Sequence, residues 1–186
     1  GTDGKVPVTV EVVERKHRSF TLGSSYRTDE RFGAKVSWED RNLRGAGERL
    51  STEAKVSGIY AGMETSYLIP AFMSEGQRLK FHSNISEERP DAYSARAADL
   101  RFLLERRFHD VITAGAGVGL KISRVEQQGS SEEFTLISVP LSLTTDTSDD
   151  VFDSASGTKT IIQAAPVHDP AIAGLTYLKT SATGTY

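Results

Sequence analysis

The sequence of 186 residues contains no cysteine, which excludes disulfides and thiolate metal sites. It has only four histidines, and no two of them are spaced as a pair of metal ligands. The net charge of −3 is mild and gives no reason to expect a nucleic-acid partner, which favours a clustered basic surface. These absences remove the most common metal and nucleic-acid functions.

Long apolar runs are also missing, because no segment approaches the ~18 apolar residues of a membrane helix. The mean hydropathy of −0.34 does not exclude a membrane β-barrel, whose alternating side chains cancel in such an average. The sequence begins with "GTDGKV", without an initiator Met or a signal peptide. We therefore expect an excised piece of a longer protein.

Helical periodicity is nearly absent, and apolar and polar residues alternate almost everywhere. In "FGAKVSWED" the apolar set begins at Phe32 and ends at Trp38. The cleanest alternation sets Ile137, Val139, Leu141 and Leu143 against Ser138 and Ser142. After a short first strand, "VPVTVEVVER", the pattern predicts about ten strands joined in hairpin order. The fold class is therefore predicted to be all-β, an antiparallel up-and-down sheet.

The length of the expected strands favours a membrane barrel over a soluble one. Soluble strands have a mode of ~5–6 residues, whereas ~9–11 tilted residues cross a bilayer. The polar face carries Lys, Arg, Glu and Asp, as a water-filled lumen allows. Aromatic residues near the strand ends resemble a membrane girdle; they are Tyr26, Trp38, Tyr60, Tyr67 and Tyr93. Alternation alone leaves a soluble lipocalin-like binder, with its apolar face inward, as an alternative.

Catalytic constellations are not convincing. Adjacent carboxylates, such as Glu87–Glu88 and Asp149–Asp150, point to opposite faces of a strand and cannot act as an acid/base pair. His109–Asp110 falls at an expected turn without a nucleophile or a third partner. "GAGVG" lacks the helix that must follow a phosphate-binding loop. We interpret Gly115, Gly117 and Gly119 as an interior stripe that either admits another backbone or relieves packing at a bend.

The stretch "SWEDRNLRGAGERL" lies between two expected strands and is unusually specific for a turn. Gly45 and Gly47 allow the positive φ angles that a tight turn needs. Asn42 can bond the nearby backbone and tolerates the left-handed region. Arg41 and Glu48 are expected where the rim meets water. Locally the stretch predicts a well-formed hairpin turn.

The segment from "VTVEVVERKHRSFTLGSS" through this turn resembles the start of the barrel in the bacterial surface antigen family. The matching turn residues are Arg41, Asn42, Leu43, Gly45, Gly47, Glu48 and Leu50. "METSYLIPAF" is similar to the family's fourth strand, and "TSDDVFDSASGTKTIIQAAP" to an Asp-rich turn, with Ser154–Ser156 in place of the usual Pro. BamA- and TamA-type members share these motifs, and the TamA type is the nearer match.

The resemblance implies a transmembrane barrel of sixteen strands, of which about ten lie here. Residues 1–16 would end the last periplasmic POTRA domain and its linker, and residues 17–186 would form the N-terminal part of the barrel. The family's Arg-Gly-Tyr or Arg-Gly-Phe loop tip, which tucks inside the barrel, is not found. The glycine stripe would be a place for that in-folded loop.

The resemblance also implies a function in the bacterial outer membrane without catalysis and without a cofactor. Such proteins insert or translocate client outer-membrane or autotransporter proteins through a lateral gate at the first barrel strand. The gate strand would comprise Phe20, Thr21, Leu22, Gly23, Ser24, Ser25 and Tyr26. Expected partners are lipid, unfolded clients and an inner-membrane-anchored, periplasm-spanning protein of the TamB type. The barrel of a patatin-like phospholipase is an alternative, although the chain has no Gly-x-Ser-x-Gly elbow.

Overall fold

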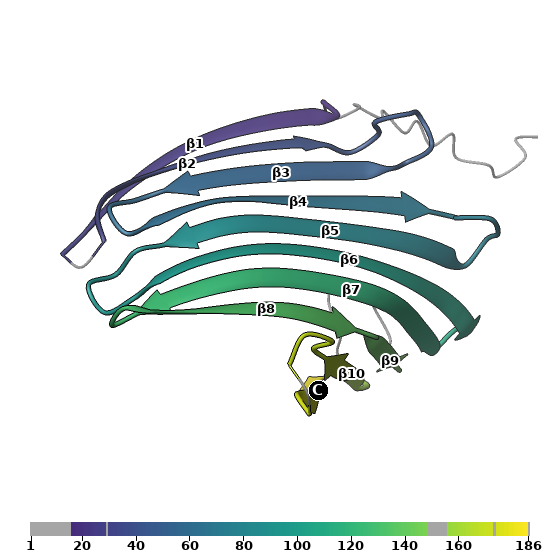
Figure 1. Ribbon diagram of the computed structural model, residues 1–186. Coiled ribbons are helices and arrows are strands. Elements are labelled where there is room, and N and C mark those ends of the chain that lie inside the picture. The colour runs from purple at the N-terminus through teal and green to yellow at the C-terminus, as the bar shows by residue number, and fades with distance from the viewer. Residues whose placement is uncertain (1–15, 29, 149–155, 173, 186) are drawn as a thin grey trace, which may run out of the picture.

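The computed structural model describes residues 16–28, 30–148, 156–172 and 174–185. Within these ranges, the strands form a single antiparallel sheet (Figure 1). Strands that are consecutive in the sequence pair with each other, except β8 and β9. No helix among the described residues is long and apolar enough to cross a membrane. The expected POTRA strand at Val6–Arg15 and the pair Asp149–Asp150 lie outside the described residues.

The bounds of the strands follow the alternating segments of the sequence. They are β1 (Arg18–Arg27), β2 (Arg31–Asp40), β3 (Arg49–Val56), β4 (Tyr60–Pro70), β5 (Gln77–Glu88), β6 (Ser94–His109), β7 (Ile112–Gln127), β8 (Ser130–Ser138), β9 (Leu141–Asp146), β10 (Lys159–His168) and β11 (Thr176–Thr185). β8 and β9 both pair with β7 and with β10. They therefore occupy one position, and the prediction of about ten strands in hairpin order is confirmed.

The division between β8 and β9 falls at Val139–Pro140. The Gly117 N–H donates to the Pro140 carbonyl at 2.9 Å, but proline has no N–H with which to return the bond. Gly119 faces Ser138 and Ala116 faces Leu141 in the same register. Pro140 thus interrupts the ladder of hydrogen bonds without shifting the pairing of the strands.

The sheet has a convex apolar face and a concave polar face, and almost no core between layers. Val167 is the only buried apolar residue among those described. The alternating apolar residues of the longer strands are exposed on the convex face; they include Leu100, Phe102, Val118, Leu120, Val139 and Leu141. The alternative of a soluble binder is therefore wrong, because it requires this face to point inward.

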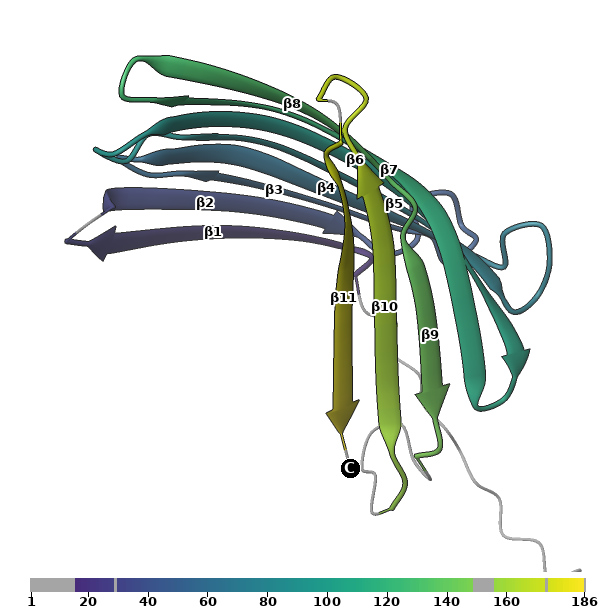
Figure 2. The ribbon, with the colours of Figure 1, turned by 60° about the horizontal axis from the view of Figure 1, so that its bottom comes forward.

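Curvature grows toward the C-terminal end of the sheet. Figure 2 shows β9, β10 and β11 turning sharply away from the direction of β1–β4, with the long strands β6 and β7 bending between the two parts. β1 and β11 are the two ends of the strand order. The edge that contains Phe20–Tyr26 and the edge formed by β11 are therefore both open among the described strands, and the sheet is a partial barrel.

The hairpin between β7 and β8 is tighter than the sequence suggested. The polar residues of "VEQQGSSEEF" are typical of a longer connection, yet Gln128 and Gly129 alone form the turn between β7 and β8. Their φ angles are 49° and 83°, and positive φ at both central residues matches the twist of a two-residue hairpin. The polar residues on either side continue the strands instead of forming a loop.

The aromatic girdle is only partly as expected. Trp38 and Tyr67 lie on the convex face, where they oppose Thr52 and Phe81, and Tyr26 is exposed at the far end of β1. Tyr60 instead lies on the concave face under the ammonium group of Lys55, and Tyr93 lines the concave side. The position of each hairpin turn decides which residues of a strand point to the convex face, and it places Tyr60 and Tyr93 on the other face from Trp38 and Tyr67.

We expect Leu141→Arg to destabilise the membrane-inserted protein by ~2–4 kcal/mol, because Leu141 lies on the convex face near the middle of the β8–β9 position. Ser142→Arg, on the concave face, is the matched control and should cost much less. Urea unfolding in lipid bilayers measures both. A larger loss for Ser142→Arg would reverse the assignment of the two faces.

Candidate functional site

The β2–β3 turn, residues 41–48, is organised by backbone geometry and one amide side chain. Gly45 and Gly47 have φ angles of 83° and 74°, as expected. The Asn42 side-chain oxygen accepts a hydrogen bond from the Gly47 N–H at 2.8 Å, and the Asn42 N–H donates to Asp40 Oδ1 at 3.0 Å. The Leu43 N–H donates to the Glu48 carbonyl at 3.2 Å. These three bonds close the turn from both sides.

Glu48 is buried, at 5 % exposed, which corrects our expectation that it meets water. Arg44 donates to both of its carboxylate oxygens at 2.8 Å. The Tyr67 hydroxyl on β4 donates to Glu48 at 2.7 Å and accepts from Arg44 at 2.9 Å. We call Arg44, Glu48 and Tyr67 the rim triad. Arg41, at the same rim, pairs instead with Glu39 at 2.9 Å.

Electrostatics keep Arg44 and Glu48 of the rim triad charged. The hydrogen bonds from Arg44, and then from Tyr67, hold the pKa of Glu48 below its ordinary value. The same pairing with Glu48 raises the pKa of Arg44. A carboxylate with bidentate guanidinium bonding and a third donor is well satisfied. The rim triad therefore ties the turn to β4, the strand beyond β3.

The expected gate strand, Phe20–Tyr26, lies within β1, whose only partner in the sheet is β2. Its pairing is uneven along its length. Phe20 opposes Trp38 and Leu22 opposes Val36, whereas Ser24 and Ser25 oppose Ala34 and Gly33. Phe20, Leu22 and Tyr26 are 63 %, 68 % and 76 % exposed. The Ser24–Ser25 stretch consequently has few bulky cross-strand contacts, whereas Tyr26 opposes Phe32 at the end of the strand.

The glycine stripe of β7 faces β6 on one side and the β8–β9 position on the other. A Cβ on Gly117 would lie 1.9 Å from the Phe102 carbonyl oxygen. A Cβ on Gly115 would meet Glu105 Cγ at 2.8 Å, and one on Gly119 would meet Arg101 Cγ at 3.1 Å. Neighbouring strands of this chain therefore use the space over the stripe, and the approach of an in-folded loop stays a prediction.

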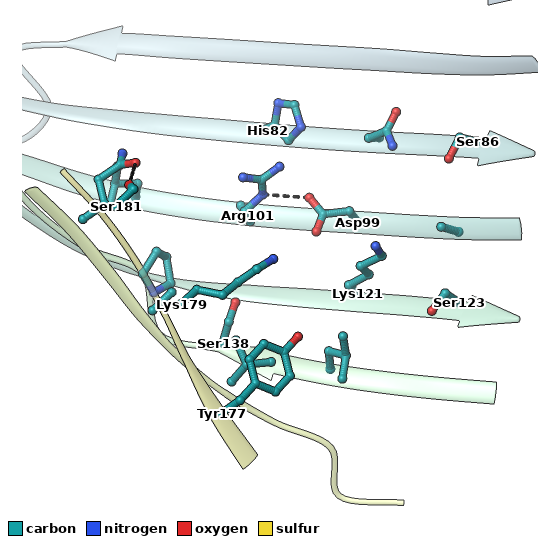
Figure 3. A pocket seen from close by; sticks show the side chains of 18 of the residues that line it. His82, Ser86, Asp99, Arg101, Lys121, Ser123, Ser138, Tyr177, Lys179 and Ser181 are labelled. Atoms are coloured by element: carbon teal, nitrogen blue, oxygen red, sulfur yellow. Dashed lines mark hydrogen bonds and ion pairs between the residues drawn. The ribbon is translucent and has the colours of Figure 1, made fainter. Parts of the chain in front are cut away.

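A trough of about 940 Å³ lies on the concave face. Its walls come from β5–β8 on one side and from β10–β11 on the other, as the labelled side chains of Figure 3 show. Arg101, Lys121 and Lys179 bring positive charge into it, and Asp99 accepts a hydrogen bond from Arg101 Nε at 2.7 Å. Serine hydroxyls make up much of the remaining wall. The trough thus carries charged and hydroxyl side chains on the concave face, which agrees with the charged polar face expected from the sequence.

The described residues contain no cluster of three His, Asp or Glu residues that could hold a metal ion.

A profile of the Omp85 superfamily domain matches residues 42–186, which is most of the chain. This chain belongs to the Omp85 superfamily. The match begins at Asn42, within the β2–β3 turn. The search of curated proteins found no match.

The Omp85 fold is also seen in a solved structure, BamA from Haemophilus ducreyi lacking POTRA domains 1–3. The TM-score is 0.68 at 12 % sequence identity, and the alignment covers 92 % of this chain and 37 % of that one. At this identity the likeness shows the fold. The present chain thus spans a little over a third of the length of the protein that it matches.

Membership in the Omp85 superfamily places this chain in the bacterial outer membrane, within a family that inserts or translocates proteins. The members are assembly factors and not enzymes. The expectations of a BamA/TamA-like fragment, an outer-membrane location and a non-enzymatic domain are confirmed. The convex face exposes apolar residues, as the lipid-facing surface of an outer-membrane barrel requires.

Sequence reasoning missed the buried carboxylates of this Omp85 chain other than Glu48, namely Asp40, Glu105 and Asp169. Asp169 accepts hydrogen bonds from the Thr135 and Ala171 N–H groups at 3.0 and 2.8 Å. An Asp before a Pro or another turn residue is a signal for such capping, and it could have found Asp40 and Asp169. The pairing of Glu105 with Lys80 at 2.7 Å depends on strand register, which the sequence does not specify.

We expect Glu48→Gln to lower the resistance of the protein to urea at neutral pH and to remove part of its acid sensitivity. The pKa of Glu48 is lowered by folding, so its contribution is complete above the ordinary value of 4.5. That contribution is lost as the pH falls through the lowered pKa. Unfolding midpoints at about pH 7 and about pH 3 measure the effect.

The exposed Glu75, in the neighbouring β4–β5 turn, provides the control. Glu75→Gln should leave the midpoint and its pH dependence close to those of the wild type. If the unfolding midpoint of Glu48→Gln depended on pH as that of the wild type does, the rim triad would add no stability.

We expect Gly117→Ala to destabilise the sheet by about 1–3 kcal/mol, since its Cβ would overlap backbone that cannot rotate away. Gly119→Ala should cost less, because its nearest obstacle is the Ser138 hydroxyl at 2.4 Å, the end of a small side chain. Equal costs in urea unfolding would mean that the β6–β7 pairing adjusts freely.

Proposed function

We propose that this chain is the N-terminal part of the barrel of an outer-membrane assembly factor that inserts or translocates other outer-membrane proteins. In this proposal residues 17–186 belong to the barrel and residues 1–16 end a POTRA domain. The clients are unfolded outer-membrane or autotransporter proteins, and a TamB-type protein is the periplasm-spanning partner. The observation that carries the proposal is the uneven, one-sided pairing of β1 in an Omp85 domain.

A strand with one free edge presents unpaired N–H and C=O groups, which can template an incoming strand. In β1 the Phe20–Trp38 and Leu22–Val36 pairs support the half near the β2–β3 turn. The stretch Gly23, Ser24 and Ser25 lies between these pairs and the Tyr26–Phe32 pair, and its small residues give few cross-strand contacts. This stretch can separate from a closing strand at low cost, so it is the part that we assign to the gate.

The second edge, β11, has a different role in this proposal. It is the edge to which the remaining strands of the barrel are added. Its residues from Thr176 to Thr185 are exposed because no further strand pairs with β11 here. The concave trough becomes part of the barrel lumen. The charged residues of the concave face are then hydrated and do not contact lipid.

A disulfide across the closing seam tests the gate. In the full-length protein, cysteines at Ser24 and in the final barrel strand should crosslink under oxidation and block client insertion. Reduction should restore activity. Client insertion into proteoliposomes, followed by protease protection, measures the effect.

The matched control joins Ser24 to Ala34, which are direct cross-strand partners in β1 and β2 and lie within disulfide reach. This bond holds the hairpin together but leaves the seam free, so activity should persist. Full activity of the seam-locked protein would remove β1 as the gate.

A further inference from the structure

A row of charged side chains crosses the convex face at the rim of the β5–β6 and β7–β8 hairpins. Glu87, Arg96, Arg124 and Glu133 are direct cross-strand partners in that order, on β5, β6, β7 and β8. These neighbouring strands lie side by side in Figure 1. We call these four residues the rim row. Arg89, in the β5–β6 turn, joins it through an ion pair with Glu87 at 2.8 Å.

The centre of the rim row places two guanidinium groups opposite each other. Like charges that are directly opposite on neighbouring strands are destabilising. Arg96 donates to Glu87 at 2.6 Å, and Arg124 donates to Glu133, so the two arginines pair with carboxylates on opposite sides. Their side chains remain 67 % and 53 % exposed. A guanidinium has five N–H donors, so both retain donors for an anion between them.

The rim row lies at the boundary of the apolar face. On β7 the apolar convex residues run from Ile112 to Ile122, and Arg124 is the next residue on that face. At ~3.4 Å per residue and a tilt of ~45°, this apolar run spans ~24 Å, close to the ~25 Å apolar band of such barrels. The arginines are therefore at the depth of lipid headgroups, not of acyl chains.

We propose that Arg96 and Arg124 bind the anionic phosphate of a lipid headgroup in the leaflet at this rim, with Arg89 beside them. Guanidinium groups match phosphate oxygens in a bidentate manner. A phosphate between the two arginines replaces their mutual repulsion with attraction. The lipid is the occupant because its acyl chains cover the apolar residues next to the row, such as Ile122, which is 52 % exposed.

The position of the acidic residues gives the site its selectivity for a membrane-anchored anion. Glu87 and Glu133 hold the guanidinium groups at the two ends of the row. Glu126, on the same face, lies one step further from the apolar band, opposite Ser94 and Ser131. A phosphate that is held at headgroup depth contacts the arginines directly. A free anion that arrives from the solvent passes the carboxylate of Glu126, which repels it.

The test measures lipid retention by the full-length protein. The protein is reconstituted in phosphatidylcholine nanodiscs that contain diphosphoryl lipid A or its dephosphorylated form, and bound lipid is then counted by native mass spectrometry. We expect the wild type to retain the phosphorylated lipid, and R96Q/R124Q to retain it about tenfold more weakly, since two charge-assisted contacts are lost. Lys121→Gln, a cation on the concave face of β7, should match the wild type.

A second variant keeps the proposal testable if R96Q/R124Q does not fold. E87Q/E133Q leaves the arginines in place and removes the carboxylates that compete for them, so it should retain the phosphorylated lipid more strongly than the wild type. Unchanged retention in both variants would overturn the proposal. So would equal retention of the dephosphorylated lipid, or full displacement by millimolar inorganic phosphate, which would indicate a site for free anions.

Discussion

The antiparallel ladder of backbone hydrogen bonds is the interaction on which the rest of this structure depends. The sheet is a single layer, and Val167 is the only buried apolar residue that the described ranges contain. There is no interior whose burial could stabilise the fold as it does in soluble domains. In the hydrocarbon of a membrane no water replaces a missing backbone bond. Complete pairing of long strands is therefore the main source of stability, and the exposed apolar face suits contact with lipid.

The features that bear on function are the places where this ladder is interrupted. β1 has a partner on one side only, and its Ser24–Ser25 stretch faces the small residues Ala34 and Gly33. Pro140 leaves a bond unreturned beside Gly117, where the β6 backbone approaches closely. The first interruption leaves an edge that can accept another strand. The second lies where β9–β11 bend away from the rest of the sheet (Figure 2).

The buried carboxylates take no part in the backbone ladder and obtain their hydrogen bonds from other groups. Each buried carboxylate among the described residues has donors: Arg18 for Asp40, the rim triad for Glu48, Lys80 for Glu105 and backbone N–H groups for Asp169. A buried charge without partners is costly. These carboxylates lie at turns or on the concave face. In the described strands, the charged residues of the convex face lie near the rims, beyond its apolar band; the rim row is one such group, and Arg106 and the Arg18–Asp40 pair lie toward the opposite rim.

The sequence by itself determined the strands, their order and the two faces, because a period of two assigns each side chain to one face and short turns permit only hairpins. It also predicted positive φ at Gly45 and Gly47, which needs only local geometry. It misplaced the β7–β8 turn, Tyr60 and Glu48. Cross-strand register decides these positions, since it selects which distant side chains become neighbours. The rim triad, the packing of Arg101 and Glu105 over the glycine stripe and the rim row each join strands that only the folded sheet brings together.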